Sequence, residues 1–336
     1  MTRHNVYGVG NALVDIEYEI SEETLADLAV DKSLMTLIEE PRHHELLAKL
    51  EGLSANRCGG GSAANTMVAA AQLGSTAFYS CKVANDETGR FFVDDLAHNG
   101  VDTNLDNDRL EHGITGKCII LITPDAERSM STFLGITREI GVAALDEAAI
   151  RDAEHLYIEG YLVPEVDARA AAVRAAEIAR AANVPIALTL SDVNMVKFFG
   201  DGLREIIGDG LDMVFANEEE AREMFGLGRG TSSLSDTVEA MKGIAKRFAI
   251  TRSEKGAVLF DGQDLIEIEA EPVTPVNANG AGDVYAGTFL HGLTHGLSFA
   301  DCGALAGACA TTLVTRTGAR LDGETTRSIG KRYGAL

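Results

Sequence analysis

Positive charge, cysteine and long apolar runs are scarce in this chain, and each shortage excludes a class of protein. The 336 residues include 29 Lys and Arg against 51 Asp and Glu, so the net charge is −22. No basic stripe is available to neutralise phosphates, and we therefore expect no nucleic-acid partner. No apolar run is long enough to cross a bilayer, and no charged-then-apolar leader precedes the first predicted strand. We expect a cytoplasmic protein with no membrane partner.

The five cysteines are odd in number and show no CxxC spacing. This pattern argues against a disulfide framework and against a zinc cluster. What is present is ordinary for a globular protein, with 46% apolar and 24% charged residues. A chain of this length can bury a substantial core, in one large α/β domain or in two smaller ones.

The most informative stretch covers residues 275–290. A turn at 277–280 opens into a small-residue apolar run, which predicts a helix to about Gly296. The first amides of a helix lack internal partners and favour negative charge, so the amides of Gly280, Ala281 and Gly282 can bind a phosphate. Asp283 follows in the first turn, where it can take a proton from a hydroxyl. A glycine-rich helix start with an acid favoured by the dipole is the alternative interpretation.

A second glycine-rich segment, residues 58–65, precedes a predicted helix that ends at Gly74. Three glycines permit backbone conformations that are closed to other residues. Ser62 is expected to cap the helix, which explains that residue without any ligand. Asn65 falls in the first turn, so its amide can reach a molecule that rests on the glycines.

Gly-Ala-Gly-Asp at the start of a late helix, with Gly-Gly-Gly-Ser-x-x-Asn far upstream, resembles the ribokinase-like (PfkB) carbohydrate and nucleoside kinases. The resemblance extends from Gly10-Asn11 to Gly318-Ala319. It implies a three-layer, doubly wound, mostly parallel α/β sheet with ATP and Mg²⁺ as cofactors. Gly8-Val9-Gly10 suggests a dinucleotide-binding turn instead, but the third glycine is missing and an alternating segment follows in place of a helix.

The resemblance also implies a single domain over 1–336, with a small β lid built from about 13–20, 33–39 and 113–136. The assembly implied is a monomer, or a homodimer through this lid. The long early excursion, the Gly10-Asn11-x-x-x-Asp15 phrase and Arg128 are similar to the adenosine-kinase-like subgroup.

For the acceptor site, the resemblance implies that Asp15 binds sugar hydroxyls and that Gly60, Gly61 and Asn65 hold the sugar. A carboxylate can accept from two vicinal hydroxyls, although a strand-end acid that faces water is the alternative. Arg128 resembles the lid arginine that reaches the transferred phosphate, and a solvated hairpin arginine is equally compatible with the sequence.

For the nucleotide site, the resemblance implies Asn217, Thr251, Gly256 and Asn279, with Glu220 helping to place Mg²⁺ through water. An N-cap asparagine followed by acids that the helix dipole favours would explain the 217–220 segment equally well. Two positions depart from the family pattern. Ser253 stands where many members have glycine, and Asn277 stands where they have an aspartate that contributes to a monovalent-cation site, so a K⁺ site is doubtful.

The predicted activity is ATP-dependent phosphorylation of a primary hydroxyl, namely the 5′-hydroxyl of a purine nucleoside. Tyr161 and Phe133 are candidates for stacking on the base. The alternative acceptor is a free sugar such as ribose, fructose or 2-keto-3-deoxygluconate, and a non-enzymatic rival is a sensor that kept the fold. His291 and His295 lie four residues apart, which suits either packing or a metal.

Overall fold

The strands of the protein form two sheets in the computed structural model, which describes residues 4–125, 127–228 and 233–336. Ala126, in the turn predicted between two strands of the lid, lies outside the described residues. The larger sheet has the order β14-β13-β12-β11-β10-β9-β1-β5-β6, and β13 runs antiparallel to both of its neighbours, β12 and β14. Its strands are β1 (Val6–Val9), β5 (Ala77–Ser80), β6 (Val101–Asp102), β9 (His155–Glu159), β10 (Ile186–Thr189), β11 (Leu211–Asn217), β12 (Ala245–Thr251), β13 (Ala257–Phe260) and β14 (Leu265–Ile268).

The strand order reverses between β1 and β9. From β1 the chain adds β5 and then β6 on one side, whereas β9 to β12 extend the sheet in the other direction. In open sheets of this type the carboxyl ends of the strands border a crevice at the point of reversal. Glu159 ends β9 and Asn11 follows β1, so both lie at that crevice.

Helices cover both faces of this sheet because its buried strands alternate between two apolar cores. In β1, Val6 belongs to one core and Tyr7 to the other. One face carries α3 (Ser62–Gln72), α4 (Glu87–His98), α10 (Ala281–Thr294), α11 (Phe299–Val314) and α12 (Gly323–Arg332). The opposite face carries α5 (Glu147–Asp152), α6 (Val166–Ala182), α7 (Val193–Ile207), α8 (Glu218–Glu223) and α9 (Leu234–Met241). This is the predicted three-layer α/β architecture.

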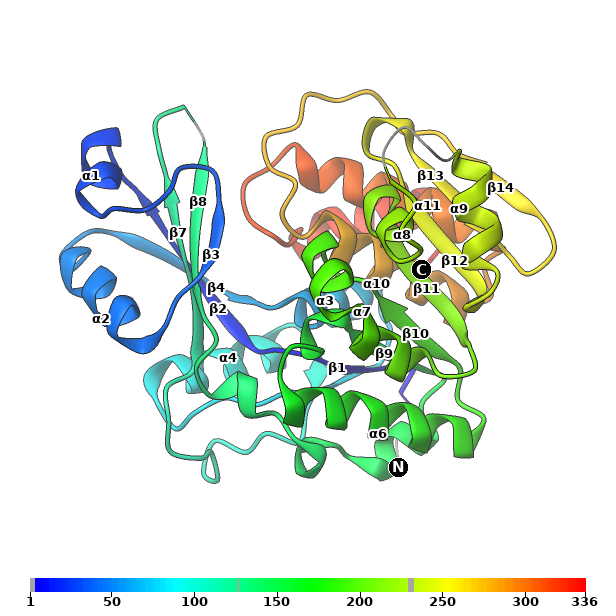
Figure 1. Ribbon diagram of the computed structural model, residues 1–336, viewed down its shortest axis with the longest axis horizontal. Coiled ribbons are helices and arrows are strands. Elements are labelled where there is room, and N and C mark those ends of the chain that lie inside the picture. The colour runs from blue at the N-terminus through cyan, green and yellow to red at the C-terminus, as the bar shows by residue number, and fades with distance from the viewer. Residues whose placement is uncertain (1–3, 126, 229–232) are drawn as a thin grey trace.

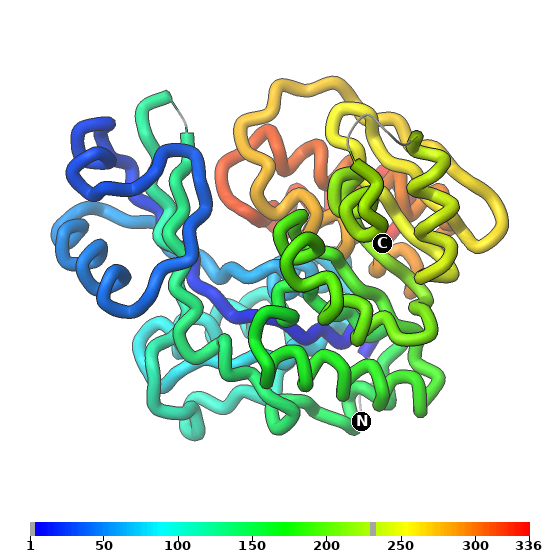
Figure 2. The backbone as a smooth tube through the Cα atoms, viewed as in Figure 1, coloured from blue at the N-terminus to red at the C-terminus, as the bar shows by residue number. Residues whose placement is uncertain are grey.

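The smaller sheet, called the lid here, projects from the larger one at the left of Figure 1. Its order is β3-β8-β7-β2-β4, with β2 (Leu13–Glu19), β3 (Met35–Leu37), β4 (Ala55–Gly60), β7 (Gly116–Ile122) and β8 (Arg128–Phe133). The helices α1 (Glu22–Asp27) and α2 (Glu40–Lys49) pack on its outer face, where Leu25 and Leu46 join Ile16 and Ile119 in one core. Figure 2 shows the chain passing from β1 into the lid as one continuous extended segment.

The helices predicted from the two glycine-rich segments are present as α3 and α10, and each ends two residues before the predicted glycine. Six strands and α-helices were not predicted: β4, β6, α2, α5, α9 and α12. The alternative of a dinucleotide-binding turn at Gly8-Val9-Gly10 is wrong, because β1 leads into strand β2 and not into a helix. No helix in the described ranges combines the length and the apolar character needed to span a membrane.

Candidate active site

A cavity of about 1220 Å³ lies between the lid and the carboxyl edge of the larger sheet. It gathers most of the side chains that the sequence singled out. Those that line it are Asp15, Gly61, Asn65, Asn217, Glu220, Thr251, Gly256, Asn279, Gly280, Ala281, Gly282 and Asp283. Gly60 and Arg128, the other two predicted site residues, are not among the lining residues.

Two helices that lie side by side, α3 and α10, both begin at this cavity. Gly287 of α10 permits their close approach, because a Cβ atom there would lie 2.2 Å from the carbonyl oxygen of Thr66 in α3. Contacts follow in the same order along both helices, from Ser62 with Asp283 near the cavity to Ser75 with His291 at the far end. The two amino ends therefore meet at the cavity wall.

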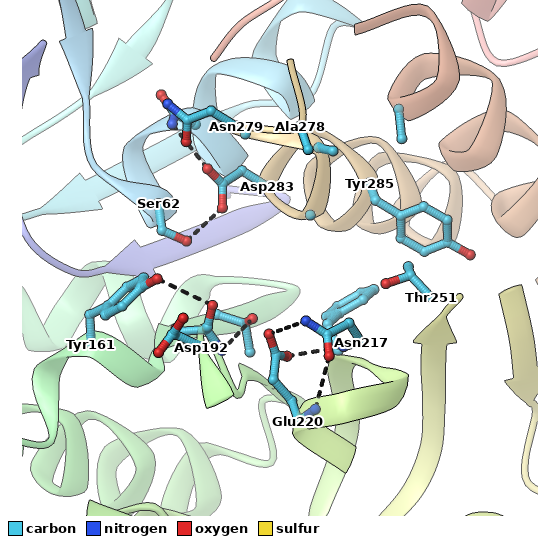
Figure 3. A pocket seen from close by; sticks show the side chains of 18 of the residues that line it. Ser62, Tyr161, Asp192, Asn217, Glu220, Thr251, Ala278, Asn279, Asp283 and Tyr285 are labelled. Carbon is cyan, nitrogen blue, oxygen red and sulfur yellow. Dashed lines mark hydrogen bonds between the residues drawn. The ribbon is translucent and has the colours of Figure 1, made fainter. Parts of the chain in front are cut away.

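The Asp283 carboxylate is held by two donors from α3. Ser62 Oγ donates to Oδ1 at 2.6 Å, and Asn65 Nδ2 donates to Oδ2 at 3.0 Å. Figure 3 shows Ser62 and Asp283 facing each other on one side of the cavity. Burial raises the pKa of Asp283, while the two hydrogen bonds and the charge of Arg320 oppose that rise. The carboxylate is thus fixed in direction and keeps lone pairs free for a further donor.

The expectation that Ser62 caps α3 is wrong. The N-cap residue is Gly61, with φ of 95°, and no side chain of the segment itself caps the helix. The carboxylate of Glu159 does this work from β9, accepting the amide of Ala63 at 2.8 Å. Glu159 also accepts from Asn11 Nδ2 at 2.9 Å, so it joins the strand that enters the lid to the helix that leaves it. Burial raises the pKa of Glu159 to about 7, against these hydrogen bonds.

The start of α10 has no such cap. Its N-cap, Gly280, lies at φ of 76° and has no side chain to offer. The amide of Ala281 donates to the carbonyl of Ala278 at 3.3 Å. Within the described residues no acceptor engages the amide of Gly282, which is exposed at the cavity. This end of α10 retains the donors and the dipole that bind an anion.

At each of the three consecutive glycines in the 59–61 segment, a different neighbour excludes a side chain. A Cβ atom at Gly59 would lie 2.1 Å from Asp95 Oδ2, and one at Gly60 would lie 2.5 Å from Asp15 Oδ1. Gly61 alone has a positive φ, and a Cβ atom there would lie 2.2 Å from the carbonyl oxygen of Asn11. Only one of the three glycines is therefore required by its backbone conformation, and the other two make room for carboxylates.

Asp15 lies in β2 on the lid, 7% exposed, at the position that Gly60 leaves open. Burial raises its pKa to about 7; the charges of Glu17 and Asp283 add to the rise, and Arg320 and Arg128 oppose it. No side chain in the described part of the protein donates a hydrogen bond to this carboxylate. A buried acid without a donor is poorly solvated, so hydroxyl donors from a bound molecule would stabilise it.

Asn217 and Glu220 form a capping box at the start of α8, as the alternative interpretation of this motif predicted. Glu220 Oε2 accepts the amide of Asn217 at 3.0 Å, and Oε1 accepts Asn217 Nδ2 at 2.6 Å. Burial raises the pKa of Glu220 to about 7, and the charges of Asp192 and Glu219 add to this. Glu220 lines the cavity beside Asn217 (Figure 3), and each of its carboxylate oxygens accepts one hydrogen bond from Asn217. A lone pair therefore remains on each oxygen, and this oxygen donor set fits a hydrated Mg²⁺.

The segment around Gly256 explains the glycine preference at position 253. Ser253 has φ of 52°, a left-handed conformation that glycine adopts without strain. Gly256 has φ of 77°, and a Cβ atom there would lie 1.9 Å from the carbonyl oxygen of Ile268. Ser253 is exposed, so its side chain has room and the cost of serine at this position is the backbone strain alone.

Asn277 organises the loop before α10 through its amide. Its Oδ1 accepts the amide of Asn279 at 2.9 Å, and its Nδ2 donates to the carbonyl of Gly318 at 2.9 Å. An aspartate at this position would offer that carbonyl no hydrogen atom.

Arg128 is not brought to the site. Its Nη1 donates to Glu17 Oε1 at 3.0 Å, and both side chains are nearly buried at the far end of the lid. Tyr161, a candidate for stacking, lines the cavity and donates through its hydroxyl to the carbonyl of Ser191 at 3.3 Å. Phe133 also borders the cavity, but its ring is stacked on His43 of α2 with centroids 4.6 Å apart.

The paired histidines near the end of α10 serve packing. Nδ1 of His291 pairs with Ser75 Oγ at 2.8 Å, and Nε2 lies 2.7 Å from the carbonyl oxygen of Ala335. Its ring stacks on His295 with centroids 4.0 Å apart. Both nitrogens of His291 are therefore already engaged. Within the described residues, no cluster of three or more potential metal-binding side chains is present.

Sequence reasoning missed four side chains of the site: Asn11, Ser62, Glu159 and Arg320. The sequence suggested only structural roles for three of them: Asn11 as the end of a strand, Ser62 as a helix cap and Glu159 as part of a strand. Their partners lie between 96 and 255 positions away in the chain. A charged residue at the end of an apolar strand, such as Glu159, is the one signal in the sequence that could have indicated a buried polar contact.

Comparison with known proteins shows the family of this chain. Residues 28–326 match the pfkB family carbohydrate kinases. The chain belongs to this family. It is 27% identical over 325 residues to the adenosine kinase of Dictyostelium discoideum, covering 90% of this chain and 92% of that protein. It is also 27% identical over 286 residues to the 5-dehydro-2-deoxygluconokinase of Clostridium beijerinckii, covering 80% and 82%.

Among solved structures, the adenosine kinase from Sinorhizobium meliloti is 32% identical, with a TM-score of 0.87 and coverage of 98% of this chain and 99% of that one. The family assignment makes the protein an ATP-dependent kinase whose acceptor is a small carbohydrate or nucleoside. The predicted ribokinase-like fold and kinase activity are confirmed. The acceptor is narrowed to these two chemical classes.

Proposed function

We propose that the protein transfers the terminal phosphoryl group of ATP to the 5′-hydroxyl of a purine nucleoside. The observation that carries this proposal is the change in polarity along the lid face that begins at Asp15. Strand pairing places Asp15, Cys118, Thr132 and Leu37 in one row across β2, β7, β8 and β3. Three strand spacings, about 14 Å in all, separate the two ends of this row.

The row changes from charged to apolar along its length. The neighbouring row ends in Met130 and Met35 on the same face, and Met35 and Leu37 are 47% and 58% exposed. A polyol at Asp15 leaves this apolar end uncovered, whereas a nucleoside would place its base against it. Tyr161 remains the candidate for stacking from the opposite wall. Phe133 is left out because His43 occupies its ring face.

In the reaction, the Asp283 carboxylate takes the proton of the acceptor hydroxyl as its oxygen bonds to the terminal phosphorus of ATP. The bond from that phosphorus to the ADP oxygen breaks. The open amides at the start of α10 stabilise the charge on the phosphoryl oxygens during transfer. Asp15 accepts hydrogen bonds from the two ribose hydroxyls.

Asn217, Thr251, Gly256 and Asn279 border the part of the cavity proposed for ATP. Glu220 would hold Mg²⁺ through water, and this ion, when bound, neutralises charge on the ATP phosphates. Activity is expected to disappear with EDTA and to return with Mg²⁺. Activity that persists in EDTA would contradict this assignment.

Arg128 has no part in the proposed reaction, because its guanidinium is paired with Glu17.

A free sugar or sugar acid is the second candidate. It is favoured by a polar part of the cavity rim, where Arg138 donates to Glu165 through Nη2 at 2.9 Å and through Nε at 3.2 Å. Arg138 is 42% exposed and lines the cavity, so it can reach a carboxyl or keto group. The relative from Clostridium beijerinckii bears the name of a sugar-derivative kinase, and the relative from Dictyostelium discoideum that of a nucleoside kinase.

The decisive experiment measures ADP release with adenosine, inosine, guanosine, cytidine, ribose, fructose and 2-keto-3-deoxygluconate. We expect a purine nucleoside to give the highest kcat/KM. The variant Leu37→Asp should lower that value without affecting any residual sugar activity. Its control is Leu53→Asp, which changes another exposed leucine, 47% exposed against 58% for Leu37, that does not line the cavity. Rapid turnover of a free sugar with no nucleoside activity would overturn the nucleoside assignment.

A further inference from the structure

Arg320 extends from the segment between α11 and α12 to a point between α3 and α4, where its side chain is 13% exposed. Its Nε donates to Asn65 Oδ1 at 2.7 Å, and its Nη1 donates to Asp95 Oδ2 at 2.6 Å. Arg320 does not line the cavity. Any effect it has on a bound molecule must therefore pass through a neighbour.

The chemistry of the guanidinium group determines how the Asn65 amide is turned. A guanidinium carries donors and no acceptor, so the atom that faces it must be the amide oxygen. The amide nitrogen of Asn65 then faces Asp283, where it donates to Oδ2 at 3.0 Å. With the amide reversed, an oxygen would face the carboxylate and an NH₂ group would face the guanidinium. Both contacts would be repulsive.

The two donors to Asp283 differ in what controls them. The hydroxyl of Ser62 rotates about its own bond and can always turn its hydrogen toward the carboxylate. The amide of Asn65 has one end that donates and one that accepts, so its direction depends on the group at the other end. Arg320 is that group.

We propose that Arg320 is a positioning residue for phosphoryl transfer, because it holds the Asn65 amide nitrogen toward Asp283 and so aligns the carboxylate with the acceptor hydroxyl. The inference deepens the proposed function and rests on the role of Asp283 as the base. Asp95 keeps the guanidinium in place from α4. Gly59 leaves room for this pair, since a Cβ atom there would lie 3.1 Å from Arg320 Nη1.

The charge of Arg320 supports the same role. Acids face it from three elements: Asp95 from α4, Asp15 from β2 and Asp283 from α10. Arg320 lowers the pKa of both Asp15 and Asp283, against the larger effect of burial. Without this cation, Asp283 would hold its proton to a higher pH and be a weaker base near neutrality.

The test compares Arg320→Met with Asn65→Ala and with the double variant. We expect Arg320→Met to lower kcat about five- to tenfold, the effect of one aligned hydrogen bond, with the KM for ATP unchanged. The acidic limb of the kcat profile should move to higher pH. In the Asn65→Ala background the same substitution should have little further effect on kcat at a pH above the acidic limb, because Asp283 is fully ionised there and the path through the amide is already gone.

Two further variants separate positioning from folding. Arg320→Lys keeps a donor for Asn65 Oδ1 and should recover part of the lost kcat. Arg316→Met removes a nearby arginine that pairs with Asp322 at the surface, and it should leave kcat unchanged. If Arg320→Met does not fold, the comparison of Arg320→Lys with the parent, alone and with Asn65→Ala, carries the same test.

Independent, multiplicative losses in the double variant would overturn the inference, and so would a lower thermal stability with an unmoved pH profile. These outcomes differ from a failure of the proposed function. If Asp283→Asn retained activity, the base itself would be wrong. An inactive Asp283→Asn variant together with a normal Arg320→Met variant would reject only the positioning role.

Discussion

The starts of α3 and α10 are alike in sequence and backbone but differ in what their first amides contact. Each helix follows a glycine-rich segment, and each has a glycine N-cap with positive φ, 95° at Gly61 and 76° at Gly280. In each case a Cβ atom would lie 2.2 Å from a backbone carbonyl oxygen. The two helices pack side by side and begin at the same cavity.

The difference is what occupies the amides. At α3 a carboxylate of the protein itself, Glu159, accepts the amide of Ala63. At α10 the amide of Gly282 faces the cavity, and a Cβ atom at Gly282 would contact nothing within 4 Å. An internal anion makes the first helix start rigid, whereas the second is available to an external anion. Glycine-rich helix starts are therefore distinguished by whether the fold supplies the negative charge.

The largest effect is expected from removing the carboxylate of Asp283 in the first turn of α10. Asp283→Asn should lower kcat by about 10²–10⁴, the usual cost of losing a general base, while ATP binding stays nearly intact. Asp301→Asn is the matched control, because Asp301 occupies the same first-turn position in α11 and accepts a hydrogen bond from the N-cap residue Ser298. Turnover of the Asp283 variant within a fewfold of the parent would remove the functional contrast between the two helices.

The second largest effect is expected from removing the Glu159 carboxylate, which accepts an amide at the start of α3. Glu159→Ala leaves the amide of Ala63 and the side chain of Asn11 without their acceptor, and should cost about 2–3 kcal/mol of unfolding free energy. Glu165→Ala is the control, since Glu165 also borders the cavity but pairs with a half-exposed arginine. Chemical denaturation of both variants measures the difference. Equal stabilities would mean that Glu159 does not close this helix start.

Alanine in place of single glycines should sharpen the comparison further. Gly61→Ala forces a side chain into a left-handed conformation against the Asn11 carbonyl, and should cost about 1–3 kcal/mol of stability. Gly282→Ala should leave thermal stability unchanged or slightly higher and lower kcat/KM for ATP about tenfold, because its methyl group would crowd the phosphate. The reverse pattern would show that the open helix start is a packing feature.

The smallest expected effect concerns monovalent cations near the open start of α10. Asn277 donates to the carbonyl of Gly318, which is then less available to a cation. Replacing choline chloride by KCl at constant ionic strength should therefore change kcat by less than about twofold, within the range of nonspecific salt effects. A large activation by K⁺ would show that the loop binds the ion in spite of this contact.

The sequence alone was sufficient to predict the helices α3 and α10, because a glycine-rich turn followed by a small-residue apolar run is a local signal. It also located the start of α10 and its acid, since glycine followed by aspartate marks a helix start that can hold an anion. It was weaker for β4, whose Ala55–Gly60 sequence lacks the apolar alternation of a strand. That strand exists because β2 pairs with it along its whole length.

Tertiary structure alone decided which partners the polar side chains of the site have. Ser62 has the composition of a helix cap, yet it donates to Asp283, because the glycine at position 287 lets α10 approach α3 closely. Arg128 is of a residue type that often binds phosphate, yet it pairs with the nearly buried Glu17 beside it on the lid. Local sequence determines backbone conformation through short-range sterics and hydrogen bonds, whereas the partner of a polar side chain depends on long-range packing that no local pattern encodes.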